Sequence, residues 1–187
     1  IDQDYYFGPQ SEIVMDPGAS ITISPNVSFG LRFGTLMTAC STPWQHIEVL
    51  PGATLDLNTY LGSFSLITPC KIEGAEEAVR IQPGGKVNSY STEYTDNGTA
   101  INALGNNGST STTQLKVVGC EFINNHKYFQ NSTGIAATDL PYTVLPFYLN
   151  FVSVLSNHFA GLTTGVFSNN SDILIDRAYF EDVSTSV

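Results

Sequence analysis

The chain has 187 residues and a formal net charge of −10, from 7 Lys+Arg against 17 Asp+Glu. This acidic balance disfavours binding to nucleic acid and docking on anionic lipid, because both need clustered Lys and Arg. Charged residues make up only 13% of the chain, which excludes a disordered polymer kept in solution by its charge. The length suits a single domain with a substantial core. No stretch approaches the ~20 apolar residues that span a bilayer, so we expect no direct membrane insertion.

The segment before the first repeat contains Asp4-Tyr-Tyr-Phe-Gly-Pro9. We interpret residues 1–11 as an N-terminal cap or lead-in. The end of a stacked β-structure presents unpaired backbone groups, and such a segment covers them.

A repeated unit follows. Three segments superimpose as a short alternating strand, a Pro-Gly corner and a second alternating strand: Ile13–Ile23, Ile47–Leu57 and Val79–Val87. Their prolines, at positions 17, 51 and 83, lie 34 and 32 residues apart. Proline fixes φ at the corner, and the glycine after it tolerates the positive φ that turns the chain. We expect Pro17 and Pro51 to lie in the same layer of the structure.

Weaker copies continue this pattern toward the C-terminus. Leu115–Phe122 keeps the glycine without the proline, and Ile173–Phe180 keeps only the alternation. The copy between residues 141 and 159 is irregular, and its register stays open. A second column of glycines, 31 to 36 residues apart, opens another short apolar segment in each unit: Gly30, Gly62, Gly98, Gly134 and Gly165. Two columns that share one period indicate a structural repeat.

The period and the strand-like alternation together predict the fold. Helical repeats of similar length need a 3.6-residue periodicity, and propeller blades need about 40 residues and four strands. A β-sandwich does not explain a motif that returns at a fixed interval. We therefore predict an all-β, right-handed parallel β-helix (solenoid) of about six coils, with one domain over residues 1–187. That the chain is part of a longer protein stays open. One inward ladder would contain equivalent apolar residues: Ile13, Ile47, Val79 and Leu115.

Several short motifs resemble those of known β-helix proteins. The Pro-Gly-Ala-Thr-Leu55 corner and the Gly-Ile135 segment resemble the repeats of parallel β-helix surface proteins, and Trp44-Gln-His-Ile47 resembles the lead-in of secreted bacterial repeats. Phe122-Ile-Asn-Asn125 and Phe167-Ser-Asn-Asn170 resemble motifs of polymorphic autotransporter passenger domains. The resemblance covers residues 12–187 and implies a secreted or cell-surface protein of the adhesin or autotransporter-passenger type. It indicates the fold more than the function, because this superfamily holds adhesins, lyases, hydrolases and phage tailspikes.

The positions of the three cysteines within the repeat predict how they pair. Cys40 lies 11 residues before Pro51, and Cys70 lies 13 residues before Pro83. Nearly equivalent positions in adjacent coils are about 4.8 Å apart, which is within the ~4.4–6.8 Å between Cα atoms of a disulfide. We predict a disulfide between Cys40 and Cys70 and a free thiol at Cys120. The alternative of three reduced cysteines, packed as small apolar residues, stays open.

Candidate catalytic residues are compared with the two ways in which β-helix enzymes cleave polysaccharides. A lyase needs a Lys or Arg as base, and the cations that would share a face are Arg80, Lys86 and Lys116. A glycoside hydrolase needs carboxylates about 5–9.5 Å apart, and the nearest pairs in sequence are Asp172/Asp176 and Glu181/Asp182. Solvated outward positions of alternating strands explain all of these residues equally well. We predict no catalytic residues and a protein that is not an enzyme.

Two features of the sequence are candidates for a metal site, a pair of histidines and a short Asx-Gly segment. His126 and His158 are 32 residues apart, which is one coil, and a stacked imidazole pair binds a metal only weakly. No third ligand has a matching spacing. Thr95-Asp-Asn-Gly98 falls short of a calcium-binding loop and is typical of an Asx-Gly turn. We predict neither a metal nor a cofactor.

Aromatic residues are densest in the irregular copy, and this pattern leaves open either a larger coil core or a contact surface. The candidate contact residues are Tyr142, Phe147, Tyr148 and Phe151. Ice binding would need a regular threonine ladder, whereas Thr22, Thr54 and Thr99 are scattered.

The expected function is non-enzymatic: an extracellular structural or adhesive module that serves as a stalk, adhesin or filament subunit. Its partners would be further copies of itself, or a glycan or protein at a surface. The alternative is a carbohydrate-binding or polysaccharide-degrading β-helix protein, such as a lyase, a hydrolase or a tailspike-like protein. Three convergent carboxylates on one face would favour this alternative.

Overall fold

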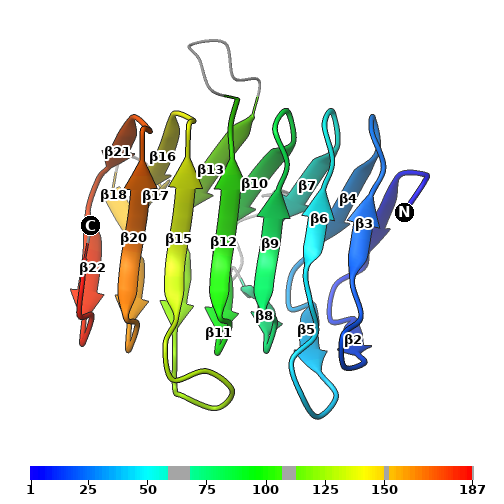
Figure 1. Cartoon of the computed structure of the whole chain (residues 1–187), viewed down its shortest axis with the longest axis horizontal. Coiled ribbons are helices and arrows are strands. Elements are labelled where there is room, and N and C mark those ends of the chain that lie inside the picture. Colours follow the sequence, from blue (N-terminus) through cyan, green and yellow to red (C-terminus); the bar gives the residue numbers. More distant parts are fainter. Residues whose placement is uncertain (59–67, 107–112, 150–151, 187) are drawn as a thin grey trace.

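Three parallel sheets run side by side along the molecule (Figure 1). The computed structural model describes residues 1–58, 68–106, 113–149 and 152–186, and the side chains outside 147–154. Sheet A contains β1 (Tyr5–Phe7), β4 (Ser28–Leu31), β7 (Thr54–Leu57), β10 (Lys86–Tyr90), β13 (Gln114–Val118), β16 (Tyr142–Leu145) and β21 (Ile173–Ile175). Sheet B contains β2 (Glu12–Met15), β5 (Leu36–Ala39), β8 (Cys70–Glu73), β11 (Thr92–Thr95), β14 (Glu121–Ile123), β19 (Asn157–Ala160) and β22 (Ala178–Glu181). Sheet C contains β3 (Ile21–Ile23), β6 (Ile47–Val49), β9 (Glu77–Ile81), β12 (Thr99–Leu104), β15 (Thr133–Thr138) and β20 (Thr164–Asn169).

The chain visits sheets A, B and C in that order and then begins the next coil, so each strand pairs with its equivalent one coil away. In Figure 1 the strands of sheet C run upward on the near side, the chain crosses over the top to the far side, and successive coils advance from right to left. This winding is right-handed. The predicted right-handed parallel β-helix of about six coils is confirmed.

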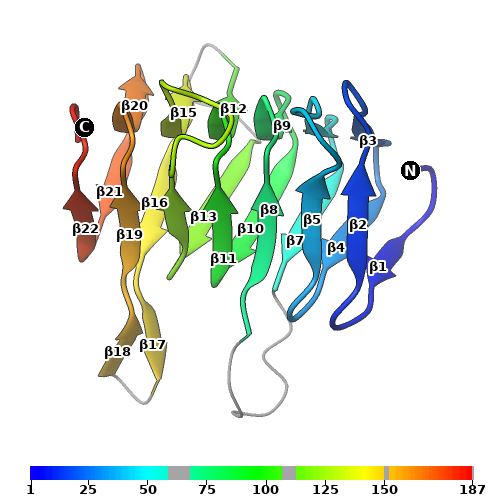
Figure 2. The same cartoon turned by 90° about the horizontal axis from the view of Figure 1, so that it is seen from below.

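One antiparallel hairpin interrupts this order. It consists of β17 (Phe147–Leu149) and β18 (Val152–Leu155), and it projects from the corner between β16 and β19 (Figure 2). This insertion explains why the sequence between residues 141 and 159 does not fit the repeat. At the other end, residues 1–11 contribute β1, which pairs with β4 as the first strand of sheet A.

The corners between sheets C and A show why the Pro-Gly motif recurs. Pro51-Gly52 and Pro83-Gly84 occupy equivalent corners, with φ of 79° at Gly52 and 90° at Gly84. In the first coil the same corner is Pro25-Asn26, and Asn26 has φ of 63°. Asparagine tolerates this left-handed conformation better than other side chains do, which is why it can replace glycine there.

The phase assigned to the first repeat is therefore wrong. Pro17 lies between β2 and β3, at a corner between sheets B and C, whereas Pro51 lies between sheets C and A. The predicted ladder is divided accordingly: Ile13 belongs to sheet B and Leu115 to sheet A, and only Ile47 and Val79 stack directly. The sheet C ladder contains Ile21, Ile47, Val79, Ile101, Ile135 and Val166.

The inward face of sheet B carries a stack of aromatic rings. Tyr94, Phe122, Phe159 and Phe180 lie in successive coils, with ring centroids 5.1, 4.6 and 4.9 Å apart and interplanar angles of 5°, 5° and 12°. Aromatic contacts of this kind add about 0.5–1.5 kcal/mol each beyond the burial of their area. Because one register repeats through the stack, each ring meets the face of the next one.

Buried asparagines satisfy backbone groups at the corners of the coils. Asn97 accepts a hydrogen bond from the Ala75 amide at 2.8 Å and donates one to the Ile72 carbonyl at 3.0 Å. Asn157 accepts one from the Cys120 amide at 2.9 Å. Both side chains thus link neighbouring coils where strand pairing is interrupted, and a buried amide or carbonyl without a partner would destabilise the fold.

The sheet C ladder predicts a contrast between Ile47 and Glu48. Ile47 is fully buried between Ile21 and Val79, so Ile47→Asp should bury an unpaired charge and lower the free energy of unfolding by more than about 4 kcal/mol. Ile47→Val should cost about 0.5–1.5 kcal/mol. Glu48→Ala, on the outward face, should cost about 0.5 kcal/mol or less. Urea unfolding measures all three, and equal losses for Ile47→Val and Glu48→Ala would contradict the assigned faces.

Candidate functional site

The cysteines occupy different positions from those predicted. Cys40, Cys70 and Cys120 are free thiols, and the predicted disulfide between Cys40 and Cys70 is not formed. Leu36 pairs with Lys71, so Cys70 lies opposite Thr35, five residues before Cys40 on the same strand and corner. At ~3.3 Å per residue this offset is about 16 Å, which is too long for a disulfide.

Two of the three thiols lie in the core on one inward row. Thr92 pairs with Cys70 in one neighbouring coil and lies opposite Cys120 in the other, and the Cys70 Sγ is 3.4 Å from the Thr92 Oγ1. Cys70 and Cys120 are thus two coils apart, about 9.6 Å between Cα atoms, and cannot be bridged without movement of the backbone. Burial raises the pKa of the Cys70 thiol to about 12, and it also raises the pKa of Cys120.

The candidate carboxylate pairs occupy positions that do not suit an acid and a base. Asp172 and Asp176 flank β21 at opposite ends, about 13 Å apart at ~3.3 Å per residue, which exceeds the separation that glycosidases use. Glu181 lies beside His158, with the Glu181 Oε2 3.3 Å from the His158 Nε2. Asp182 follows at a bend with φ of 51°.

The histidine pair is also separated. Phe122 pairs with Phe159, which places His158 opposite Glu121, while His126 lies in the turn beyond β14 with φ of 60°. The two imidazoles therefore do not stack. Among the described residues, no group of three or more His, Cys, Asp and Glu side chains is placed to hold a metal ion.

Asp96 and Asn97 form a turn within the solenoid, as the Asx-Gly reading suggests. Asp96 is buried with φ of 52°, and its Oδ1 accepts hydrogen bonds from the amides of Asn125 at 2.6 Å and Lys127 at 3.3 Å. The carboxylate thus fixes the loop of the next coil.

Of the candidate contact residues, Tyr142 is buried in β16. The side chains of Phe147 and Tyr148 and the whole of Phe151 lie outside the described residues.

A group of titratable side chains lies on sheet C. Arg80 donates from Nε to the Glu77 Oε2 at 2.7 Å, and Asn102 donates to the same oxygen at 3.2 Å. The hydrogen bond from Arg80 lowers the pKa of Glu77. Gln82 donates to the Glu48 Oε1 at 2.8 Å, and Glu48 lies opposite Arg80 in register. At the preceding corner, burial and then the charge of Arg80 lower the pKa of His46. The cluster is a network of satisfied charges.

Sheet B carries a second charged network. Lys71 lies 3.1 Å from Glu93 and 3.5 Å from Glu73, and Lys127 forms an ion pair with the same Glu73. Although burial would raise the pKa of Glu73, the hydrogen bond from Lys127 and the charge of Lys71 lower it. These interactions tie together β8, β11 of the next coil and the loop after β14 in the coil that follows.

A row of threonines that the sequence analysis missed also crosses sheet C. Thr99, Thr133 and Thr164 pair in successive coils, and a bridge extends the row to Thr185. The next outward row is Asn102, Ala136 and Phe167. The threonines are half-buried except for the exposed Thr185, and they form one row without a parallel second one.

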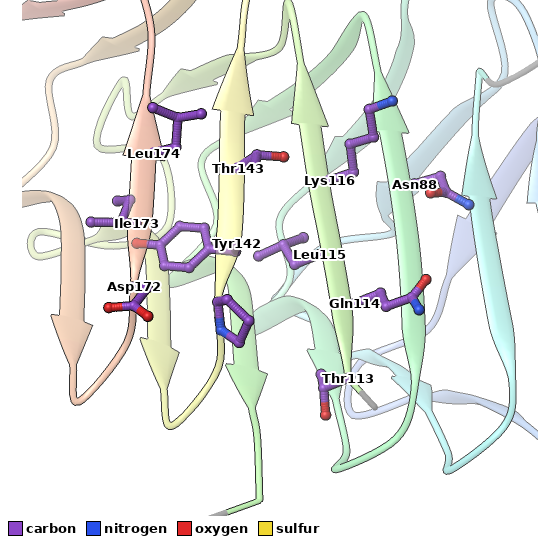
Figure 3. Close-up of a pocket in the computed structure, with 11 residues that line it drawn as sticks. Asn88, Thr113, Gln114, Leu115, Lys116, Tyr142, Thr143, Asp172, Ile173 and Leu174 are labelled. Carbon is purple, nitrogen blue, oxygen red and sulfur yellow. The ribbon is translucent and has the colours of Figure 1, made fainter. Parts of the chain in front are cut away.

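The outer face of sheet A holds a shallow depression of about 540 Å³ (Figure 3). Asn88, Lys116, Thr143 and Leu174 cross it as one row on four adjacent strands, and Gln114 and Asp172 lie beside this row. Lys86 pairs with Gln114 at the edge of the depression. The expectation that Arg80, Lys86 and Lys116 share a face is wrong for Arg80, which lies on sheet C, whereas Lys86 and Lys116 lie on adjacent strands of sheet A.

Comparisons with known protein families, with curated protein sequences and with solved structures found no match to this chain. No helix among the described residues is long and apolar enough to cross a membrane. The two Phe-x-x-Asn motifs occupy unequal positions: Phe122 is buried in the sheet B stack, whereas Phe167 is exposed on sheet C.

Burial of the thiols predicts their reactivity. In the native protein without reductant, iodoacetamide should label Cys40, because the thiolate is the reacting form and both buried thiols are held protonated. After unfolding, still without reductant, all three cysteines should be labelled. Mass analysis of the peptides decides: a cysteine that stays unlabelled after unfolding would reveal a disulfide, and native labelling of Cys70 as fast as Cys40 would contradict its burial.

Proposed function

We propose that this chain is a non-enzymatic extracellular structural or adhesive module, acting as a stalk, adhesin or filament subunit. The observation that supports this is the continuity of the stack, in which sheets A and B each join seven strands coil to coil. Each coil is held by backbone hydrogen bonds and apolar contacts to its neighbours, so the solenoid is a rigid body whose length grows coil by coil. Such a body can hold two attached parts at a fixed distance, as a stalk does, or present a binding surface, as an adhesin does.

Placement outside the cell rests on the character of the surface. The acidic charge and the abundance of Asn, Ser and Thr suit a protein that meets glycans and ions rather than nucleic acid. The Trp44-Gln-His-Ile47 lead-in and the Pro-Gly-Ala-Thr-Leu55 corner, which resemble those of secreted β-helix proteins, support the same setting. Adhesion would be carried by outward rows, because inward rows are occupied by the core.

A second candidate function, polysaccharide cleavage, would have to use the cluster on sheet C. His46, Glu48, Glu77 and Arg80 are the groups from which an acid–base pair would be drawn. A general acid at neutral pH needs a carboxyl group whose pKa is raised. Here Arg80 and Asn102 both donate hydrogen bonds to Glu77, which favours its ionised form. The cluster therefore fits a structural ion pair better than a catalytic one.

The non-enzymatic function predicts that acidic and neutral polysaccharides are not cleaved. Reducing-end assays for hydrolysis, and absorbance of unsaturated products for lyase action, should show no product above a heat-denatured control. Glu77→Gln should behave as the unmodified protein does, because Glu77 has only a structural role. Steady product formation that is lost in Glu77→Gln, Asp176→Ala or Glu181→Ala would contradict the proposal and support the second candidate.

A further inference from the structure

Six of the 7 Lys and Arg residues of this acidic protein fall into two groups, and the remaining one, Arg32, lies over the Tyr6 ring, 4.9 Å from its centre. Lys71, Lys127, Arg80 and Arg177 each form an ion pair with a carboxylate on sheet B or C or at their corners. By contrast, Lys86 and Lys116 on sheet A form no ion pair with any carboxylate in the described part of the chain. Lys116 is exposed and Lys86 is half-buried, and a cation that reaches solvent without an acidic partner is available to an anion from outside.

Lys86 and Lys116 alternate with two amides on adjacent strands. Lys86 on β10 pairs with Gln114 on β13, and Asn88 on β10 pairs with Lys116 on β13. Adjacent strands are about 4.8 Å apart, and outward residues recur about every 6.6 Å along a strand. The Cα atoms of the two lysines, which lie on a diagonal, are therefore about 8 Å apart. A single flexible anionic chain can contact both ammonium groups and both amides at this spacing.

Neighbouring side chains orient the Asn88 amide and the Lys116 ammonium group. Asn88 donates from Nδ2 to the Asp56 Oδ1 at 2.9 Å, which fixes the amide plane. The Lys116 Nζ lies 5.2 Å from the centre of the Tyr90 ring, a cation–π contact that limits where the ammonium group can lie. The depression lined by Asn88, Gln114, Lys116 and Thr143 continues along the solenoid axis toward Leu174 and Asp172, which lie at the end away from Lys86.

We propose that this face of sheet A binds an acidic polysaccharide that runs along the solenoid axis, with its anionic groups on Lys86 and Lys116. Gln114, Asn88 and Thr143 would hydrogen-bond sugar hydroxyls, and the apolar rim at Leu174 would pack against a sugar ring. The anionic group is a carboxylate of a uronic acid or a sulfate ester, because each accepts hydrogen bonds from an ammonium group. This inference rests on the adhesive form of the proposed function and names its ligand.

A polysaccharide fits this face better than a nucleic acid does. Double-stranded DNA carries about one negative charge per 1.7 Å, which two lysines on a protein of net charge −10 cannot balance. Recognition of single strands relies on exposed aromatic rings that stack on bases. The ring that lines the depression is that of Tyr142, which is buried, and the half-buried Tyr90 ring beside it lies under the Lys116 ammonium group. Amides and a hydroxyl beside two separated charges suit a sugar polymer that bears one charge per residue or fewer.

The test measures binding of the full chain to three soluble polymers at about 0.15 M salt, where long-range charge effects are screened. Polygalacturonate presents carboxylates, dextran sulfate presents sulfate esters, and dextran is neutral. We expect binding to at least one of the two anionic polymers and none to dextran. In Lys86→Gln/Lys116→Gln the affinity for the bound polymer should fall by about tenfold or more. Lys86→Arg/Lys116→Arg should keep most of the binding.

The matched control is Lys71→Gln/Lys127→Gln, which removes the same two charges from sheet B. It should leave the affinity within about twofold of that of the unmodified protein, since neither residue lies on sheet A. Urea midpoints confirm that each variant is folded. Equal losses in the two Lys→Gln double variants, equal binding of dextran, or equal binding of duplex DNA would overturn the site.

The outcomes separate this inference from the function on which it rests. If the folded protein binds neither anionic polymer and cleaves nothing, the acidic-polysaccharide site is wrong while the structural module stands. If the protein binds an anionic polymer through the two lysines and also releases products from it, the site is right and the non-enzymatic function is wrong.

Discussion

Every other feature of this structure depends on the hydrogen-bonded register between each strand and its equivalent one coil away. The register continues through the corners: the Gly52 amide donates to the Gly84 carbonyl at 2.9 Å, and the Cys40 amide donates to the Met15 carbonyl at 2.9 Å. Because side chains alternate with a period of two, a slip of one residue would turn every inward row outward. The stack of Tyr94, Phe122 and Phe159 requires the same register in three consecutive coils, so the core and the backbone pairing specify one another.

The period and the fold class could be predicted from the sequence because their signals are local. Alternating apolar residues and Pro-Gly corners identify strands and turns without reference to distant contacts. The phase of the first coil could not, because that coil has two corners of the same chemistry. Pro17-Gly18 and Pro25-Asn26 each combine a proline with a residue of positive φ, at 72° and 63°. Only pairing with the next coil shows that Pro25 is the equivalent of Pro51.

Unequal corner lengths account for the errors at the candidate sites. The corner after β5 spans residues 40–46, whereas the corner after β8 spans 74–76, so counting back from Pro51 and Pro83 does not give equivalent positions for Cys40 and Cys70. Arg80 and Lys116 each follow the first inward residue of a recognised copy, but those copies begin on different sheets. The sequence therefore indicates which residues face outward more reliably than it indicates which sheet carries them.

The outward rows differ among the sheets in a way that the net charge conceals. On sheets B and C a nearby acid partners these cations: Glu93 of the next coil lies beside Lys71, and Glu77 of the same strand lies beside Arg80. On sheet A the residues opposite Lys86 and Lys116 are neutral. The protein as a whole repels anions at long range, yet at about 0.15 M salt that repulsion decays within ~8 Å, while contacts made at the surface persist. An acidic solenoid can therefore bind an acidic polymer if the contact is confined to a face where the register leaves its cations unpaired.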